Sequence, residues 1–160
     1  MTTTMTAPEV QTTQVYVILI KASQEAVWEA ITEPEFVAQY FHGARLEREL
    51  KSGGLYRSHS PDGSQLWVDA QVIEVDPPRR FVHGWRSLYN PECAEEPESR
   101  VSWEIEAQEE GICKLTVVHD QLEQSLKTAA SVAGVGWMTV LSGLKTLLET
   151  GQPLAGPSTT

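Results

Sequence analysis

Residues 136–149 read Gly-Trp-Met-Thr-Val-Leu-Ser-Gly-Leu-Lys-Thr-Leu-Leu-Glu. Apolar residues recur in this stretch at the period of one helix face, through Trp137, Leu141, Leu144 and Leu148. Gly151 follows at a place suited to a left-handed C-cap. The pattern predicts a long amphipathic helix over 136–150, and a helix with one broad apolar face needs an apolar surface to cover it.

Strands provide that surface. Seven segments are rich in β-branched and aromatic residues or alternate between apolar and polar side chains, namely residues 14–20, 44–50, 55–59, 66–75, 80–88, 100–108 and 112–119. Ser23 as an N-cap and Pro34 as a first helical residue begin two short helices after the first strand, and residues 121–133 are weakly helical. We therefore predict an α+β fold, in which a curved antiparallel sheet of about six to seven strands wraps around the long C-terminal helix.

The length of 160 residues fits one domain, and no repeat or linker divides the chain. Residues 1–12 are rich in threonine and are expected to form a disordered tail. The domain is expected to span 13–150, and residues 151–160 a flexible tail.

Charge and composition exclude several classes of partner. Lys and Arg number 12 against 22 Asp and Glu, so the formal charge is 12 − 22 = −10. Such a chain lacks the basic stripe that binds nucleic acid or an anionic membrane. Cys93 and Cys113 have no metal-like spacing and are too few for a disulfide framework. Without a signal-peptide pattern or a run of about 18 apolar residues, we expect no membrane insertion and a cytoplasmic location.

Aromatic residues are the first candidates for a ligand site. Trp85, Trp103 and Trp137 lie on strand or helix faces that the periodicity directs inward. These rings either fill the core or line a cavity and stack on a planar ligand. Trp67 is open to both orientations, and Trp28 is interpreted as plain core.

Titratable residues are the second group. His83 and His119 share inward faces, where each is either a hydrogen-bonded core residue or a group that contacts a ligand and moves a proton. Asp69 lies on a strand face that is either solvated or buried with an arginine partner. The glutamates within residues 90–98 are interpreted as a solvated loop. No H-x-x-H pattern occurs, so no metal site and no cofactor is expected.

Several short motifs, spread in order along residues 14–150, carry a resemblance. They are Ala22-Ser23-Gln24-Glu25-Ala26-Val27-Trp28, Glu33-Pro34-Glu35 before Tyr40-Phe41, Gly53-Gly54-Leu55-Tyr56, residues 72–81 running into Trp85, His119, and the helical stretch from Gly136. Together they resemble the START-like, helix-grip superfamily, specifically the bacterial group related to the activator of the heat-shock-protein-90 ATPase. The chain departs from that pattern at Tyr40, where relatives often carry Trp, and at Val68-Asp69-Ala70, where many place Gly. Both departures alter the size or polarity of the cavity that the resemblance implies.

The resemblance implies an enclosed cavity between sheet and long helix, which across the superfamily holds lipids, polyketides and other apolar small molecules. Our leading hypothesis is a non-enzymatic protein that binds a small apolar or aromatic molecule. The expected ligand contacts are Tyr40, Phe41, Trp67, His83, Trp85, Trp103, His119, Trp137 and Leu141.

Two alternatives remain open, because a fold does not fix a function. One is an enzyme acting on a hydrophobic molecule, such as a cyclase, dehydratase or hydrolase, with His83, His119 or Asp69 as acid–base groups. The other is a co-chaperone or stress-related interaction protein, whose outer surface contacts a chaperone or a second copy of the chain.

Overall fold

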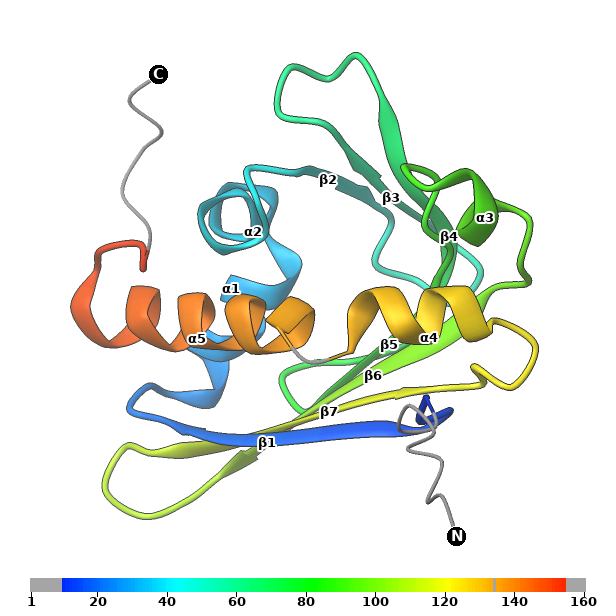
Figure 1. Cartoon of the computed structure of the whole chain (residues 1–160). Helices are drawn as coiled ribbons and strands as arrows, with labels where there is room; N and C mark the ends of the chain where they lie inside the picture. The colour runs from blue at the N-terminus through cyan, green and yellow to red at the C-terminus, as the bar shows by residue number, and fades with distance from the viewer. Residues whose placement is uncertain (1–9, 134, 155–160) are drawn as a thin grey trace, which may run out of the picture.

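The computed structural model of the chain describes residues 10–133 and 135–154. The strands are β1 (Gln14–Ile20), β2 (Arg45–Arg48), β3 (Leu55–His59), β4 (Leu66–Asp76), β5 (Arg80–Trp85), β6 (Ser99–Ala107) and β7 (Cys113–Asp120). The helices are α1 (Gln24–Thr32), α2 (Pro34–Tyr40), α3 (Pro91–Ala94), α4 (Leu126–Val132) and α5 (Val135–Thr150). These described residues form the predicted α+β fold (Figure 1).

One antiparallel sheet contains all seven of these strands, in the order β1-β7-β6-β5-β4-β3-β2. Strands β2 to β7 pair with their neighbours in the sequence, whereas β1 pairs with β7. The segment with α1 and α2 carries the chain from one edge of the sheet to the other. In Figure 1 the sheet curves from β1 and β7, below α5, to β2 and β3, above it, so it wraps around the long helix as predicted.

The long helix buries the face that its periodicity predicts. Trp137, Leu141 and Leu144 are buried, and Leu148 is partly buried and packed against the core. The helix ends where Gly151 adopts a φ of 76° and its N–H donates to the carbonyl of Leu147 at 2.8 Å. A left-handed glycine closes the last turn in this way because it has no Cβ to clash with the backbone.

The two short helices begin as predicted and are tied to each other. The Ser23 hydroxyl accepts a hydrogen bond from the N–H of Ala26 at 3.1 Å and caps α1, and Pro34 occupies the first turn of α2. The Tyr40 hydroxyl, at the end of α2, donates to the carbonyl of Ala30 at 2.7 Å. Tyr40 also lies directly against Gly143 of α5. Tyr40 therefore joins three helices.

A β-bulge interrupts the pairing of β3 with β4. Ser58 is paired with Val68, but the next pair is His59 with Leu66, so Trp67 is the extra residue on β4. A bulge re-aims a side chain that strict alternation would send to the other face. Trp67 would otherwise share the outer face with Asp69.

The acidic segment before β6 differs from its interpretation as a solvated loop. It contains the short helix α3, and the Glu96 carboxylate accepts hydrogen bonds from the N–H groups of Lys127 and Thr128 at 2.9 and 2.7 Å. These N–H groups belong to the first turn of α4, which lacks a side-chain bond from its own N-cap, Ser125. Glu96 thus caps a helix about 30 residues away.

Element boundaries elsewhere shift by a few residues. β5 ends at Trp85 instead of residue 88, because its pairing with β6 ends at Ser99 and only an isolated bridge between Val68 and Ser87 joins the following residues to β4. Residues 10–13 and 151–154 form neither helix nor strand. The remaining parts of the two predicted tails, 1–9 and 155–160, lie outside the described residues.

Candidate ligand-binding site

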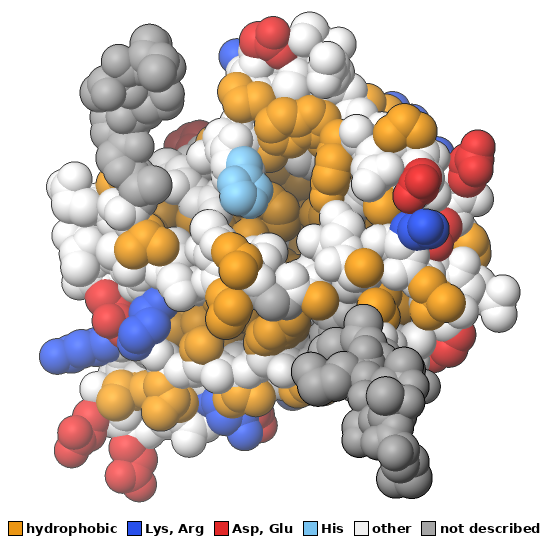
Figure 2. Space-filling view, in the orientation of Figure 1, with side chains coloured by type: hydrophobic (Ala, Val, Ile, Leu, Met, Phe, Trp, Pro, Cys, Tyr) orange, Lys and Arg blue, Asp and Glu red, His pale blue; other side chains and the backbone are white. Residues whose placement is uncertain are grey.

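A pocket of about 370 Å³ opens between the sheet and the helices. The sheet contributes Ser58 from β3, Trp67 and Val68 from β4, and Trp85 from β5. Ser58, Val68 and Trp85 are directed inward by the alternation of their strands, and Trp67 joins them through the bulge. Figure 2 shows a hollow in the surface of the molecule, seen from the same side as in Figure 1, with apolar side chains inside it.

Three helical segments close the other side of the pocket. Phe41 and His42 follow α2, Val132 ends α4, and Trp137 and Val140 lie on the first turns of α5. The Phe41 ring lies 5.9 Å from the Trp85 ring, measured between centroids. Aromatic rings from a helix end and from the sheet therefore meet across the pocket.

Two of the pocket tryptophans, Trp85 and Trp137, donate their indole N–H groups to partners inside the protein. The indole N–H of Trp85 donates to the Ser87 hydroxyl at 2.9 Å, and that of Trp137 donates to Nδ1 of His119 at 3.2 Å. Trp137 also packs edge-on against Trp103, with centroids 5.6 Å apart. Because both donors are satisfied, these two rings offer mainly apolar surface to the pocket.

His119 is fixed by a chain of hydrogen bonds with one consistent direction. Its Nδ1 accepts from Trp137, whose indole nitrogen is only a donor, so Nε2 carries the proton of the neutral ring. Nε2 lies 2.7 Å from the hydroxyl of Ser99, which in turn donates to the carbonyl of Trp85 at 3.2 Å. Both ring nitrogens are therefore occupied.

His83 is fixed in a similar way. Its Nε2 accepts the indole N–H of Trp103 at 3.0 Å, so Nδ1 carries the proton and donates to the carbonyl of Gly84 at 2.7 Å. The ring is stacked on Tyr56, with centroids 3.8 Å apart and planes 11° from parallel. A general base needs an accessible lone pair, and in His83 that lone pair is already engaged.

Burial keeps both histidines neutral. Desolvation lowers the pKa of His83 from 6.5 to about 4, against the opposing hydrogen bond to Gly84. Desolvation also lowers the pKa of His119 to about 3, where a charge on His83 acts in the same direction and Asp120 opposes it. Proton transfer near neutral pH requires a pKa close to 7, which neither ring has.

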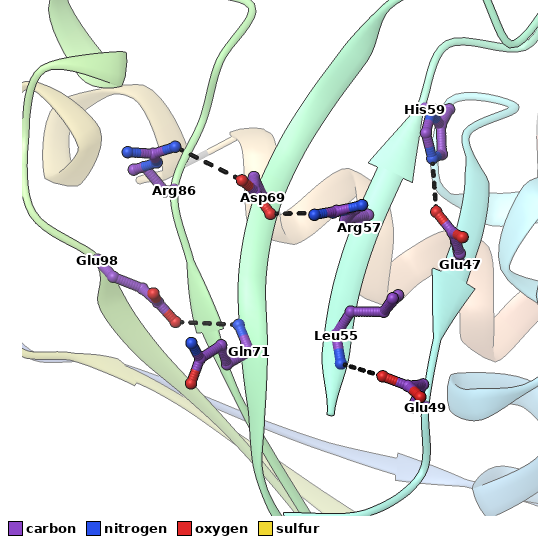
Figure 3. Close-up of polar contacts among 9 residues, drawn as sticks. All are labelled: Glu47, Glu49, Leu55, Arg57, His59, Asp69, Gln71, Arg86 and Glu98. Atoms are coloured by element: carbon purple, nitrogen blue, oxygen red, sulfur yellow. Dashed lines mark hydrogen bonds and ion pairs between the residues drawn. The ribbon is translucent and has the colours of Figure 1, made fainter. Parts of the chain in front are cut away.

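Asp69 lies on the opposite side of the sheet from the histidines. Its carboxylate is held between Arg57, whose Nε lies 3.2 Å from Oδ1, and Arg86, whose guanidinium lies 3.6 Å from Oδ2 (Figure 3). The Asp69 side chain is 34% exposed, whereas its strand neighbours Val68 and Ala70 are buried inward. The three acid–base candidates therefore do not converge on the pocket.

The structure divides the nine predicted ligand contacts into two sets. Those that line the pocket are Phe41, Trp67, Trp85 and Trp137. Those buried outside the lining are Tyr40, His83, Trp103, His119 and Leu141. Of this second set, Tyr40, His83, Trp103 and His119 each pack against an aromatic ring of the lining. Direct ligand contact remains a prediction for all nine.

Other lining residues escaped the sequence analysis. Ser58 and Val140 are buried, and their strand and helix positions are compatible with the inward faces already assigned. His42 and Tyr89 are exposed at the mouth and come from connecting segments without periodicity. Only the tertiary arrangement brings such loop residues to a pocket.

The described residues contain no group of three or more His, Cys, Asp or Glu side chains that could hold a metal ion. No single helix among them has the length and apolar composition to cross a membrane, and only the bent pair of α4 and α5 together meets that test.

Comparison with known proteins identifies relatives of the whole domain. A family model described as Activator of Hsp90 ATPase homolog 1-like protein matches residues 21–149, which is most of the chain. A search among curated proteins found no match.

Solved structures share the fold. CalU16 from Micromonospora echinospora has a TM-score of 0.69 and 22% identity, over 88% of this chain and 76% of CalU16. DynU16, from the dynemicin biosynthetic locus, has a TM-score of 0.72 and 27% identity, over 89% of this chain but only 49% of DynU16. The Aha1 dimer from Colwellia psychrerythraea has a TM-score of 0.65 and 17% identity, over 88% of this chain and 98% of that chain.

Proposed function

The chain belongs to the family of Activator of Hsp90 ATPase homolog 1-like proteins, and from this membership and the pocket we propose that it binds one small, mainly apolar molecule. The observation that carries the proposal is the pocket of about 370 Å³ between the sheet and the helices. Pockets of roughly 300–1,000 Å³ with mostly apolar walls are typical of small-molecule sites.

The lining favours a neutral ligand with a flat apolar body. Trp67, Trp85 and Trp137 provide aromatic surface, and none of the described lining residues is Asp, Glu, Lys or Arg. Burying an ionised group against such walls would be costly, because no partner charge would compensate its lost hydration. Aromatic, polyketide-like and lipid-like molecules fit this chemistry.

A few polar groups orient the ligand. The Ser58 hydroxyl lies in a buried part of the wall, whereas His42, Tyr89 and Ser131 lie at the exposed rim. These groups can donate or accept hydrogen bonds. We expect one ligand oxygen near Ser58 and the more polar end of the molecule at the rim.

The proposed role is binding without catalysis. His83 and His119 lie behind the wall with both ring nitrogens engaged, and Asp69 is ion-paired on the outer face. The free cysteines Cys93 and Cys113 are buried, which suits a reducing compartment, and a cytoplasmic location is part of the same proposal.

The decisive experiment titrates the chain with N-phenyl-1-naphthylamine, a neutral aromatic fluorophore. We expect probe fluorescence to rise, tryptophan fluorescence to change and the melting temperature to increase, because the probe binds only the folded state. Native mass spectrometry of gently purified protein provides an independent search for a retained ligand.

Val140→Trp is the blocking variant for this titration. Val140 faces the pocket, so the larger ring enters the void, and we expect probe binding to fall at least about tenfold with little loss of stability. Met138→Trp is the matched control, since Met138 is 52% exposed on the same helix and should leave binding unchanged. Equal binding by wild type and Val140→Trp would contradict the proposal, as would the absence of any response.

Leu141→Trp tests whether the void lies beside Val140 and not beside its neighbour Leu141. Leu141 is buried next to Val140 but does not line the pocket. A larger ring there overpacks the core, at an expected cost of about 1–3 kcal/mol. Chemical denaturation of the two variants should therefore separate them, with Leu141→Trp the less stable.

A second candidate function is contact with a chaperone. The family description, which refers to the Hsp90 ATPase, favours it. The test is the ATPase rate of purified Hsp90 with and without an excess of this chain. An unchanged rate removes this candidate and leaves the ligand proposal untouched.

A further inference from the structure

The two edge strands of the sheet, β2 and β1, are protected to different extents. At the β2 edge, Arg48 donates from Nε to the carbonyl of Thr32 at 2.8 Å and pairs with Glu33 at 3.3 Å, which ties this strand to the α1–α2 segment. Arg45 and Glu47 add further charges to the same strand. Charged residues and covering segments prevent an edge strand from pairing with another chain.

The β1 edge is protected only at its C-terminal end, where Lys145 and Glu149 of α5 bond the backbone of Leu19 and Lys21. No charged residue and no proline occurs from Val10 to Ile20, and the pairing of β1 with β7 runs without a register shift. Val15, Val17 and Leu19 alternate onto the outer face, where they are 57, 55 and 54% exposed. A flat apolar edge of this kind is a template for strand addition.

Two hydrogen bonds reveal which backbone groups point away from β7. Lys145 donates from Nζ to the carbonyl of Leu19 at 2.7 Å, and the N–H of Lys21 donates to Glu149 at 2.9 Å. Alternate residues of a strand direct both of their backbone groups to the same side. The N–H and C=O groups of Val15 and Val17 therefore also point to the open side.

We propose that two copies of this chain pair through β1, antiparallel, about a two-fold axis at Val17. In this register Val17 lies opposite Val17 of the second copy, and Val15 lies opposite Leu19. The Leu19 carbonyl then exchanges its bond from Lys145 for one from the N–H of Val15 of the second copy. The three apolar side chains of each copy then form one continuous row, and the two seven-stranded sheets become one. Such an interface is isologous, as closed dimers require.

Charge selects this surface and this direction. The chain carries a formal charge of −10, so two copies repel each other, and the repulsion is smallest where an uncharged strip meets an uncharged strip. Lys21, Lys145 and Glu149 cluster at one end of β1. Antiparallel pairing sets that cluster beside the uncharged residues 10–14 of the second copy, whereas parallel pairing would set the two clusters side by side.

Sedimentation velocity of the full chain over a range of concentrations tests the proposal. We expect a concentration-dependent dimer, and we expect Val17→Lys to raise its dissociation constant by at least about tenfold, because two like charges then meet on the axis. Ile73→Lys is the matched control, since Ile73 is an aliphatic residue 45% exposed on β4, away from β1. Melting temperatures near wild type show that both variants are folded.

Cross-linking provides a second readout of the axis. Cys93 and Cys113 are buried, so Val17→Cys adds an accessible thiol that a short bismaleimide should join to its copy. Ile73→Cys should not cross-link under the same conditions. A chain that stays monomeric up to roughly millimolar concentration, or a dimer that Val17→Lys leaves intact, overturns the proposal.

Discussion

His83 and His119 act as neutral hydrogen-bonding residues of the core. Each accepts the indole N–H of a tryptophan through one ring nitrogen and donates through the other. Trp103 and Trp137 would otherwise bury an N–H without a partner, at a cost of about 1–3 kcal/mol each. The two imidazoles therefore satisfy the indole N–H of Trp137 in the pocket wall and that of Trp103 behind it.

This arrangement predicts that acid destabilises the fold at pH values well above those at which carboxylates titrate. The unfolded histidines take up protons below about pH 6.5, whereas the folded ones do so only near pH 4 for His83 and pH 3 for His119. The unfolded state thus binds more protons as pH falls from 6.5, and stability decreases by about 1.4 kcal/mol per pH unit for each histidine. Urea unfolding at pH 7, 6 and 5 measures this slope.

The histidine ring protons provide the check in NMR spectra. We expect the resonances of His83 and His119 to stay unchanged from pH 7 to pH 5. His83→Phe should be less stable at pH 7 but show about half the slope. A ring that titrates near pH 6.5 in the folded protein would rule out the neutral, hydrogen-bonded state described above.

At the scale of elements, α5 and α2 approach each other through Gly143. A Cβ added at this position would lie 3.1 Å from the Cβ of Tyr40, whose hydroxyl is anchored on Ala30. Alanine favours a helix over glycine by about 1 kcal/mol, but here α2 must move to accept it. We expect Gly143→Ala to lower stability in chemical denaturation.

Gly136→Ala is the matched comparison on the same helix. Its added Cβ would lie 3.5 Å from the carbonyl oxygen of Ser131, an ordinary contact, so the helical preference should make it neutral or stabilising. The expected order of stability is therefore Gly136→Ala above Gly143→Ala. The reverse order would show that the α2–α5 contact is loosely packed.

Local patterns were sufficient for most elements. The limits of β1 and β3, the Ser23 cap and the Gly151 C-cap follow from residues close in sequence, and the structure confirms them. Contacts between residues far apart in the sequence could not be predicted from such local patterns. The Glu96 carboxylate caps α4, 31 and 32 residues further along the chain, and no short-range pattern distinguishes it from a solvated glutamate.

The pocket was harder to predict than the fold for the same reason. The inward faces of Trp85 and Trp137 follow from strand and helix periods, and both rings line the pocket. Trp67 reaches it only through a register shift, and Tyr89 only through the path of a connecting segment. Periodicity also cannot separate Leu141 in the solid core from Val140 beside the void, because adjacent residues on one broad helix face are both buried.

For the whole molecule, the sheet and α5 depend on each other. The sheet curves around the helix (Figure 1). Its strands contribute large buried residues such as Phe81 and Leu115 to the core. Without α5 the face of the sheet that wraps around the helix would be exposed to water over much of its length. The pocket would also lose Trp137 and Val140, so binding and folding share one element.

A chain that ends after residue 134 should therefore show no cooperative unfolding transition. It lacks the buried side chains of α5, which are Trp137, Val140, Leu141, Leu144 and Leu147. Each large apolar side chain contributes about 1.5–3 kcal/mol on burial, so the five together contribute an amount comparable to the ~5–15 kcal/mol that stabilises a typical domain. Thermal and urea unfolding followed by circular dichroism measure the transition.

A chain that ends at Leu154 keeps every described element and should melt like the full chain. If the shorter chain instead melts sharply near the wild-type temperature, the sheet is stable alone and the helix serves only to enclose the pocket.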